Sequence, residues 1–150
     1  EVTGLTTSGY EAIYDSQLAI HNIFHRKKIY KSTKAIPKII YGSSEIATVG
    51  MSELNLKLSG KIYQSAIAPM GVLGKSVTSQ YTSGFVKLLT NNRGVLLGAS
   101  VVSPNASEII NILSIAINTK MQACQLSNTV FASPSWSEAI KVASGKIYCF

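Results

Sequence analysis

GFVKLL at residues 84–89 and VLLGASVV at residues 95–102 flank the turn sequence NNRG at residues 91–94. Both runs are rich in the apolar and β-branched residues that favour strands. An Asn/Gly turn between two such runs is a strong signal for a β-hairpin. The chain is therefore predicted to contain at least one antiparallel strand pair.

Three more strands are predicted upstream of this hairpin. Residues 36–41 form a short strand with a proline at its entry, which a strand tolerates. Residues 46–49 form a second short strand, and residues 61–68 alternate in the way that is typical of a third. Between the last two, a Ser-Glu start and spaced leucines predict a short helix over residues 52–59, which Gly60 ends.

Four further segments are predicted to be helical: residues 10–24, 105–118, 122–128 and 135–143. Apolar side chains in residues 10–24 follow a period close to 3.6, so we expect that helix to bury one broad face. The predicted fold class is α+β, with a largely antiparallel sheet of about five strands and helices packed on it.

Residues 69–80 have two glycines and no firm period, so they are predicted to be an irregular excursion. GVLGKS at residues 71–76 has the Gly-Lys-Ser ending of a phosphate-binding loop. Only two residues separate its glycines, whereas that motif needs four. Nucleotide binding at this loop is therefore not expected.

The segment 105–118 carries apolar residues on more than one face. Such a helix has more apolar surface than one core contact needs. It lies either in the middle of its domain or against a partner subunit.

The composition fits one folded domain, with 150 residues of which 46% are hydrophobic. The net charge of +7 comes mainly from a basic segment at residues 26–38, and no aromatic residues alternate with its cations. We therefore expect no nucleic-acid partner; the alternative, binding through this segment, predicts salt-sensitive binding. No membrane span or signal peptide is expected, and the expected location is cytoplasmic. The Thr/Gly/Ser-rich start at Glu1 suggests a piece of a longer protein.

Cysteine and histidine are sparse. Cys124 and Cys149 match no CxxC or metal-ligand spacing, so they are expected to be reduced structural thiols. His21 and His25 stand one helical turn apart, but no third ligand accompanies them, so no metal site is expected.

Residues 129–138, TVFASPSWSE, predict a turn into a helix. Pro134 restricts its own backbone and that of Ser133. Ser135 can cap the helix, and Glu138 three residues later completes a capping box.

Seven motifs occur in one order: IP (36–37), SEIATVG (44–50), GFVKL (84–88), LGA (97–99), PNASEII (104–110), LSNT (126–129) and PSWSE (134–138). Together they resemble the C-terminal dimerisation domain of the pyridine nucleotide-disulfide oxidoreductases, dihydrolipoamide dehydrogenase above all. The resemblance covers residues 36–144, and residues 10–24 resemble the end of the preceding flavin domain.

The resemblance implies a homodimer and two domains here, residues 1–35 as flavin-domain tail and linker and residues 36–150 as the dimerisation domain. It implies FAD and NAD(P) bound by flavin and nucleotide domains of a parent chain, and none bound by this fragment, which has no GxGxxG and no Cys-x4-Cys. The fragment alone is expected to be inactive. The implied dimer contact is the helix 105–118, through Glu108, Ile109, Ile112, Leu113, Ile115 and Ala116.

In the family, a His backed by a Glu serves as acid and base for thiol-disulfide exchange. The pattern His-x-His-Pro-Thr-x-x-Glu falls on residues 131–138. Phe131 and Ser133 replace the two histidines, and a serine hydroxyl has no pKa near neutrality. Glu138 stands at the position of the family's catalytic carboxylate, but its histidine partner is absent. A helix-capping role explains Glu138 equally well. The alternatives are a divergent flavoenzyme that is not a disulfide reductase or is similar to mercuric reductase, and a binding module put to a new use.

Overall fold

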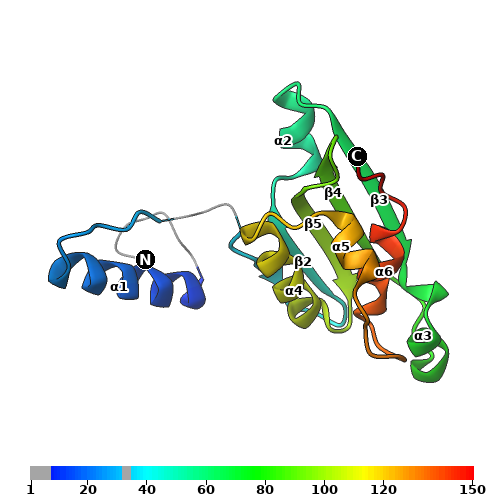
Figure 1. Ribbon diagram of the computed structural model, residues 1–150. Coiled ribbons are helices and arrows are strands. Elements are labelled where there is room, and N and C mark those ends of the chain that lie inside the picture. The colour runs from blue at the N-terminus through cyan, green and yellow to red at the C-terminus, as the bar shows by residue number, and fades with distance from the viewer. Residues whose placement is uncertain (1–7, 32–34) are drawn as a thin grey trace. The chain divides into compact units, whose positions relative to one another are not determined.

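The computed structural model describes residues 8–31 and 35–150 of the chain (Figure 1). It divides into two compact units, Glu1–Thr33 and Lys34–Phe150. Residues 1–7 and 32–34, which belong to the predicted flavin-domain tail and linker, lie outside the described residues.

The first unit is the predicted helix, α1 (Gly9–Phe24). The prediction that it buries a broad face is wrong, because no residue of α1 is buried in the structure. Ile13, Ile23 and Phe24 are between 61% and 79% exposed. The apolar residues of α1 do recur with the helical period, but nothing within the described part of this unit covers them. The sequence pattern therefore identified an apolar face correctly but did not show that it is buried. In the basic segment that follows, Lys31 pairs with Asp15 at 2.7 Å.

The second unit is built on one five-stranded sheet in the order β1-β2-β5-β4-β3, with every neighbouring pair antiparallel. Its strands are β1 (Lys38–Ile40), β2 (Glu45–Gly50), β3 (Tyr63–Pro69), β4 (Phe85–Asn91) and β5 (Leu96–Ser103). This confirms the predicted α+β class and the predicted strand count.

The predicted β4–β5 hairpin is confirmed, and both of its strands lie in the interior of the sheet. The Asn91 side-chain oxygen accepts hydrogen bonds from the backbone N–H groups of Arg93 and Val95 at 2.9 and 3.0 Å. Gly94 adopts a φ of 77°, a left-handed conformation that glycine reaches without strain. The Asn and Gly of the turn therefore close the hairpin by the chemistry expected of them.

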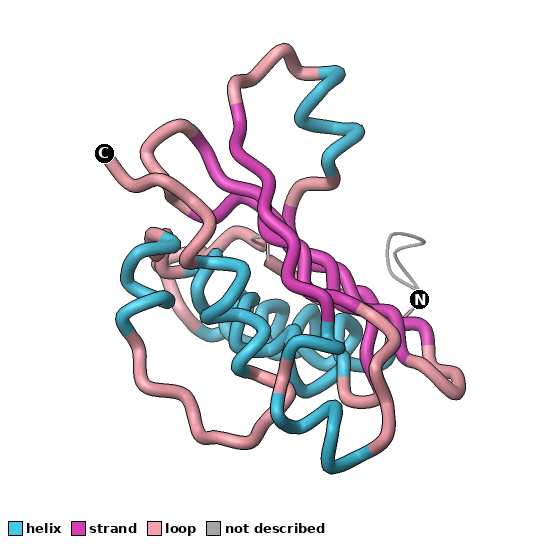
Figure 2. Tube along the Cα trace, turned by 90° about the vertical axis from the view of Figure 1, so that its right-hand side faces the viewer, coloured by secondary structure: helices cyan, strands magenta, loops and turns pink. Residues whose placement is uncertain are grey.

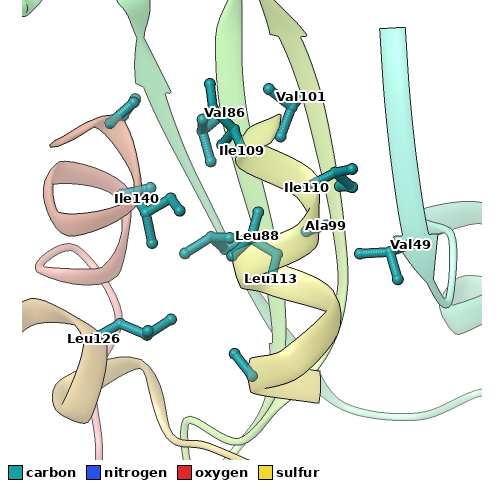
Figure 3. Close-up of a cluster of buried hydrophobic side chains, with 14 of the residues drawn as sticks. Val49, Val86, Leu88, Ala99, Val101, Ile109, Ile110, Leu113, Leu126 and Ile140 are labelled. Carbon is teal, nitrogen blue, oxygen red and sulfur yellow. The ribbon is translucent and has the colours of Figure 1, made fainter. Parts of the chain in front are cut away.

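The helices α4 (Ala106–Asn118), α5 (Ala123–Asn128) and α6 (Glu138–Ser144) lie together against the sheet, whose strands are seen nearly edge-on in Figure 2. Burial alternates along β2 and β3, as it must where one face of a sheet is covered. Leu113 of α4, Leu88 of β4 and Ile140 of α6 meet in the core (Figure 3). All three side chains are fully buried.

Residues 69–80 are not the irregular excursion that was predicted. They form a short 3₁₀ helix, η1 (Met70–Val72), and α3 (Gly74–Ser79), which ends at Gln80 with a left-handed φ of 52°. Ser76 is fully buried and its hydroxyl donates to the Met70 carbonyl, so this serine belongs to the packing of the segment. A helix of six residues is too short to show a clear apolar period, which is why its sequence looked irregular.

The other predicted helix of this region is confirmed as α2 (Glu53–Leu58). Its N-cap is Ser52, whose hydroxyl accepts the N–H of Asn55 at 3.1 Å. Within the described residues, no helix is long and apolar enough to cross a membrane.

Candidate functional site

The candidate site is the turn between α5 and α6, residues 129–137. It is attached to the body of the domain by Trp136, which is only 9% exposed and packs edge-on against Tyr81 with ring centroids 6.0 Å apart. The Ser133–Pro134 peptide bond is cis. Gly74 of α3 lies next to this turn, since a Cβ there would stand 3.9 Å from the Cβ of Pro134. The turn therefore has a defined position beside α3.

The predicted capping box at the start of α6 is only half formed. The Glu138 carboxylate accepts the backbone N–H of Ser135 at 2.9 Å, but the Ser135 hydroxyl is buried with no hydrogen-bond partner. The helix begins at Glu138 with Ser137 as its N-cap, three residues after the predicted start. The N–H of Ala139 bonds to the Trp136 carbonyl at 3.2 Å, so a tighter turn takes up these residues before the helix can begin.

Ser133 and Phe131 occupy the two positions at which the resemblance implies histidines. Ser133 is exposed, and the described residues offer its hydroxyl no hydrogen-bond partner. Phe131 is half-buried and packs against the hydrophobic core. A free hydroxyl and a packed phenyl ring cannot shuttle protons near neutral pH. Because the Glu138 carboxylate bonds the backbone of its own turn, the three side chains form no acid–base pair in this subunit.

The six residues predicted for the dimer contact divide between two sides of α4. Ile109, Leu113 and Ala116 are at most 1% exposed and belong to the core cluster of their own subunit. Their side chains have no surface left for a partner. Ile115, by contrast, is 64% exposed. Glu108 is also exposed, and Ile112 is half-buried. Of the six predicted residues, only Glu108, Ile112 and Ile115 therefore keep side-chain surface that a partner could contact.

Sequence reasoning missed a charged cluster that joins α2 to the sheet. The Glu53 carboxylate accepts hydrogen bonds from the Lys87 ammonium and, at 2.9 Å, from the Tyr63 hydroxyl. These bonds, the one from Lys87 first, lower the pKa of Glu53 from 4.5 to about 2. Burial, followed by the bond to Glu53, raises the pKa of Tyr63 above its usual value. No motif marks this cluster, because its members are 10 and 34 residues apart.

The part of the chain that the structure describes contains no group of three or more His, Cys, Asp or Glu side chains that could hold a metal ion. His21 and His25 stack on each other, with ring centroids 4.1 Å apart and planes 6° from parallel. The sheet of residues 35–150 is wholly antiparallel and lacks the strand–glycine turn–helix unit that holds a dinucleotide.

Residues 36–144 match the model of the pyridine nucleotide-disulphide oxidoreductase dimerisation domain. These are the bounds that the sequence motifs predicted. Among curated proteins, the chain is 32% identical over 145 residues to a dihydrolipoyl dehydrogenase of Buchnera aphidicola. The aligned region covers 96% of this chain and 30% of that protein. It is 35% identical over 112 residues to a dihydrolipoyl dehydrogenase of Staphylococcus aureus, covering 74% of this chain and 24% of that protein.

The structure is similar to that of the HOCl-induced flavoprotein disulfide reductase of Escherichia coli, with a TM-score of 0.91 and a sequence identity of 23%. The matched region covers 98% of this chain and 34% of the reductase chain. At this identity the likeness concerns the fold. The chain spans about a third or less of the length of the relatives that it matches.

Proposed function

Because this chain belongs to the pyridine nucleotide-disulphide oxidoreductases through the dimerisation domain of that family, we propose that it is the homodimerisation module of a flavin-dependent disulfide oxidoreductase similar to dihydrolipoamide dehydrogenase. The observation that carries this proposal is the two-sided helix α4. One side of the helix fills the core of its own subunit through Leu113, while Ile115 on the other side is 64% exposed. A helix face of this kind can pair with the same face of a second copy about a two-fold axis.

The proposed module is a scaffold without acid–base chemistry of its own. Thiol-disulfide exchange needs a group that titrates near the working pH, and Ser133 does not supply one. Its hydroxyl is exposed and has no partner among the described residues, and Glu138 already accepts a hydrogen bond from its own turn. We therefore assign Glu138 a capping role.

FAD and NAD(P) belong, on this proposal, to other domains of a longer parent chain. The relatives' names and the share of them that this chain covers support such a parent. Residues 1–35 are then the end of the flavin domain and the linker, in keeping with the exposed apolar side chains of α1. The parent's substrate class, a disulfide, follows only from the family.

Self-association tests the proposal directly. Multi-angle light scattering of the chain at tens of micromolar, a concentration at which ordinary dimers persist, should give twice the monomer mass of 16.1 kDa. A monomer throughout this range would overturn the dimerisation role.

The missing imidazole has its own test in the parent protein. A Ser133→His variant should raise thiol-disulfide turnover if the rest of the family's catalytic constellation is present, and the gain from a positioned general acid or base is typically about 100-fold or more. An unchanged rate would favour the second candidate function, a flavoenzyme whose chemistry does not use this turn. Ser133 is exposed and has no hydrogen-bond partner among the described residues, and this observation supports the second candidate.

A further inference from the structure

The structure brings together the two cysteines that the sequence placed 25 residues apart. Cys124 is near the start of α5, and Cys149 is the penultimate residue of the chain. The backbone N–H of Cys124 donates to the Cys149 sulfur at 3.1 Å. The Cα of Cys124 is one bond of about 1.5 Å from that nitrogen, so the Cys149 sulfur lies within about 4.6 Å of it. The two residues are therefore neighbours, which their spacing did not indicate.

The C-terminal tail reaches this position through specific contacts. The side chain of Gln64 bonds the backbone of Tyr148 on both sides, donating to its carbonyl at 2.8 Å and accepting its N–H at 3.0 Å. Ile147 is only 8% exposed. At the hairpin turn, a Cβ on Gly94 would stand 2.7 Å from the Cys149 sulfur, so only glycine leaves room for the thiol.

We propose that Cys124 and Cys149 are a redox-sensitive pair that forms an intramolecular disulfide on exposure to a small-molecule disulfide. Bridged cysteines have Cα atoms about 4.4–6.8 Å apart, and a Cys149 sulfur within about 4.6 Å of the Cys124 Cα is compatible with such a bridge. Both residues are partly exposed, so a small oxidant can reach them.

The reaction is thiol-disulfide exchange in two steps. One cysteine thiolate attacks a sulfur of the small disulfide, whose S–S bond breaks and releases one thiolate. The second cysteine thiolate then attacks the protein sulfur of this mixed disulfide and releases the other. Two protein thiols are oxidised to one disulfide, the small disulfide takes up the two electrons, and the two thiol protons finish on its two thiolates.

The rate of this thiol-disulfide exchange should depend on pH. Burial, followed by the hydrogen bond with Cys124, raises the pKa of Cys149 above its usual value. Since the thiolate is the attacking species, attack by Cys149 should become faster as the pH rises.

The disulfide would enclose the candidate site turn. The chain between Cys124 and Cys149 contains the rest of α5, the turn at residues 129–137 and all of α6. Closing this loop joins its two ends covalently and restricts the unfolded chain. Oxidation would thus fasten the turn and α6 to the domain, and reduction would release the link.

Mass spectrometry of the whole chain in glutathione redox buffers tests the proposal. Oxidised glutathione should protect both cysteines from alkylation. Trypsin cleaves after Lys120, Lys141 and Lys146, so residues 121–141 and 147–150 should be recovered as one disulfide-linked pair. Closing a loop of this length should raise the thermal midpoint by roughly 10 °C, and Cys149→Ser should remove that rise. Two mixed disulfides with glutathione, links between chains, or alkylation of both thiols under fully oxidising conditions would each overturn the proposal.

Gln64→Ala is the matched variant that keeps both thiols. It removes the two hydrogen bonds that hold the tail, and also the longer bonds from the same amide nitrogen to the Asn91 and Asn92 carbonyls at 3.4 and 3.3 Å. Its glutathione midpoint should therefore shift roughly tenfold toward oxidising conditions. A midpoint equal to that of the unmodified chain would contradict the role given to the docked tail.

Discussion

Two substitutions on α4 separate its two sides, and we predict that Ile115→Ala weakens the dimer while Leu113→Ala destabilises the subunit. Ile115 is 64% exposed in the monomer, and alanine lacks three of its carbons. A buried methylene is worth about 0.8 kcal/mol, so covering that exposed fraction at an interface contributes about 1.5 kcal/mol per copy. A two-fold contact uses two copies, or about 3 kcal/mol, which corresponds to a roughly 100-fold rise in the dissociation constant.

Sedimentation equilibrium over a range of concentrations measures this constant. Leu54→Ala is the matched control, since Leu54 is 65% exposed but lies on α2, away from the proposed contact. The control should leave the dissociation constant unchanged within about twofold. Equal weakening by both substitutions, or none by Ile115→Ala, would refute the assignment of α4 to the dimer contact.

Leu113→Ala gives the opposite signature. Leu113 is fully buried within its own subunit, and large-to-small core substitutions of this kind cost about 2–5 kcal/mol. For a domain of this size the thermal midpoint should fall by roughly 5–15 °C. If Leu113→Ala weakened the dimer and left the stability of the subunit unchanged, Leu113 would lie on the side of α4 that contacts the partner, and the assignment of the two sides would be wrong.

Three further predictions concern the turn, the charged cluster and the sheet. Glu138→Ala removes the acceptor for the N–H of its turn and should lower the free energy of unfolding by about 0.5–2 kcal/mol; an unchanged thermal midpoint would contradict the capping role. The pKa of Glu53 is lowered from 4.5 to about 2, so its stabilising contribution is full above pH 4.5 and is lost as the pH falls toward 2; in acid titrations followed by circular dichroism, Glu53→Gln should lose less stability across this window. Gly84→Ala would place a Cβ 2.1 Å from the Val102 carbonyl oxygen at a φ of 101°, and should lower the urea midpoint far more than Gly60→Ala, which has a φ of 65° and open space around it.

Local chemistry explains why much of the fold was predictable. The hairpin has an Asn/Gly turn, α2 has a serine cap, and both signals act between residues that are close in the chain. The helix α3 was missed because its six residues carry no period and Ser76 is held by a contact made only in the folded segment. The start of α6 was placed too early for a similar reason, since Trp136 takes part in a tight turn before the helix begins.

The candidate site was predictable only as a pattern of residue types. The motif order located the turn, and Phe131 and Ser133 stand at the positions where the resemblance implies histidines. The structure then showed what these residues do instead. Phe131 packs on the core, Ser133 stays exposed, and Glu138 bonds the backbone of Ser135.

By itself, the sequence determined the five strands, most of the helices and the family, because each depends on which residues occur and how they are spaced. Only the tertiary structure decided which side of α4 is free, since Leu113 and Ile115 are both apolar and differ only in what packs on them. It also decided that Cys124 and Cys149 are neighbours. Such pairings arise when distant segments pack on one sheet, and no local period or cap records them.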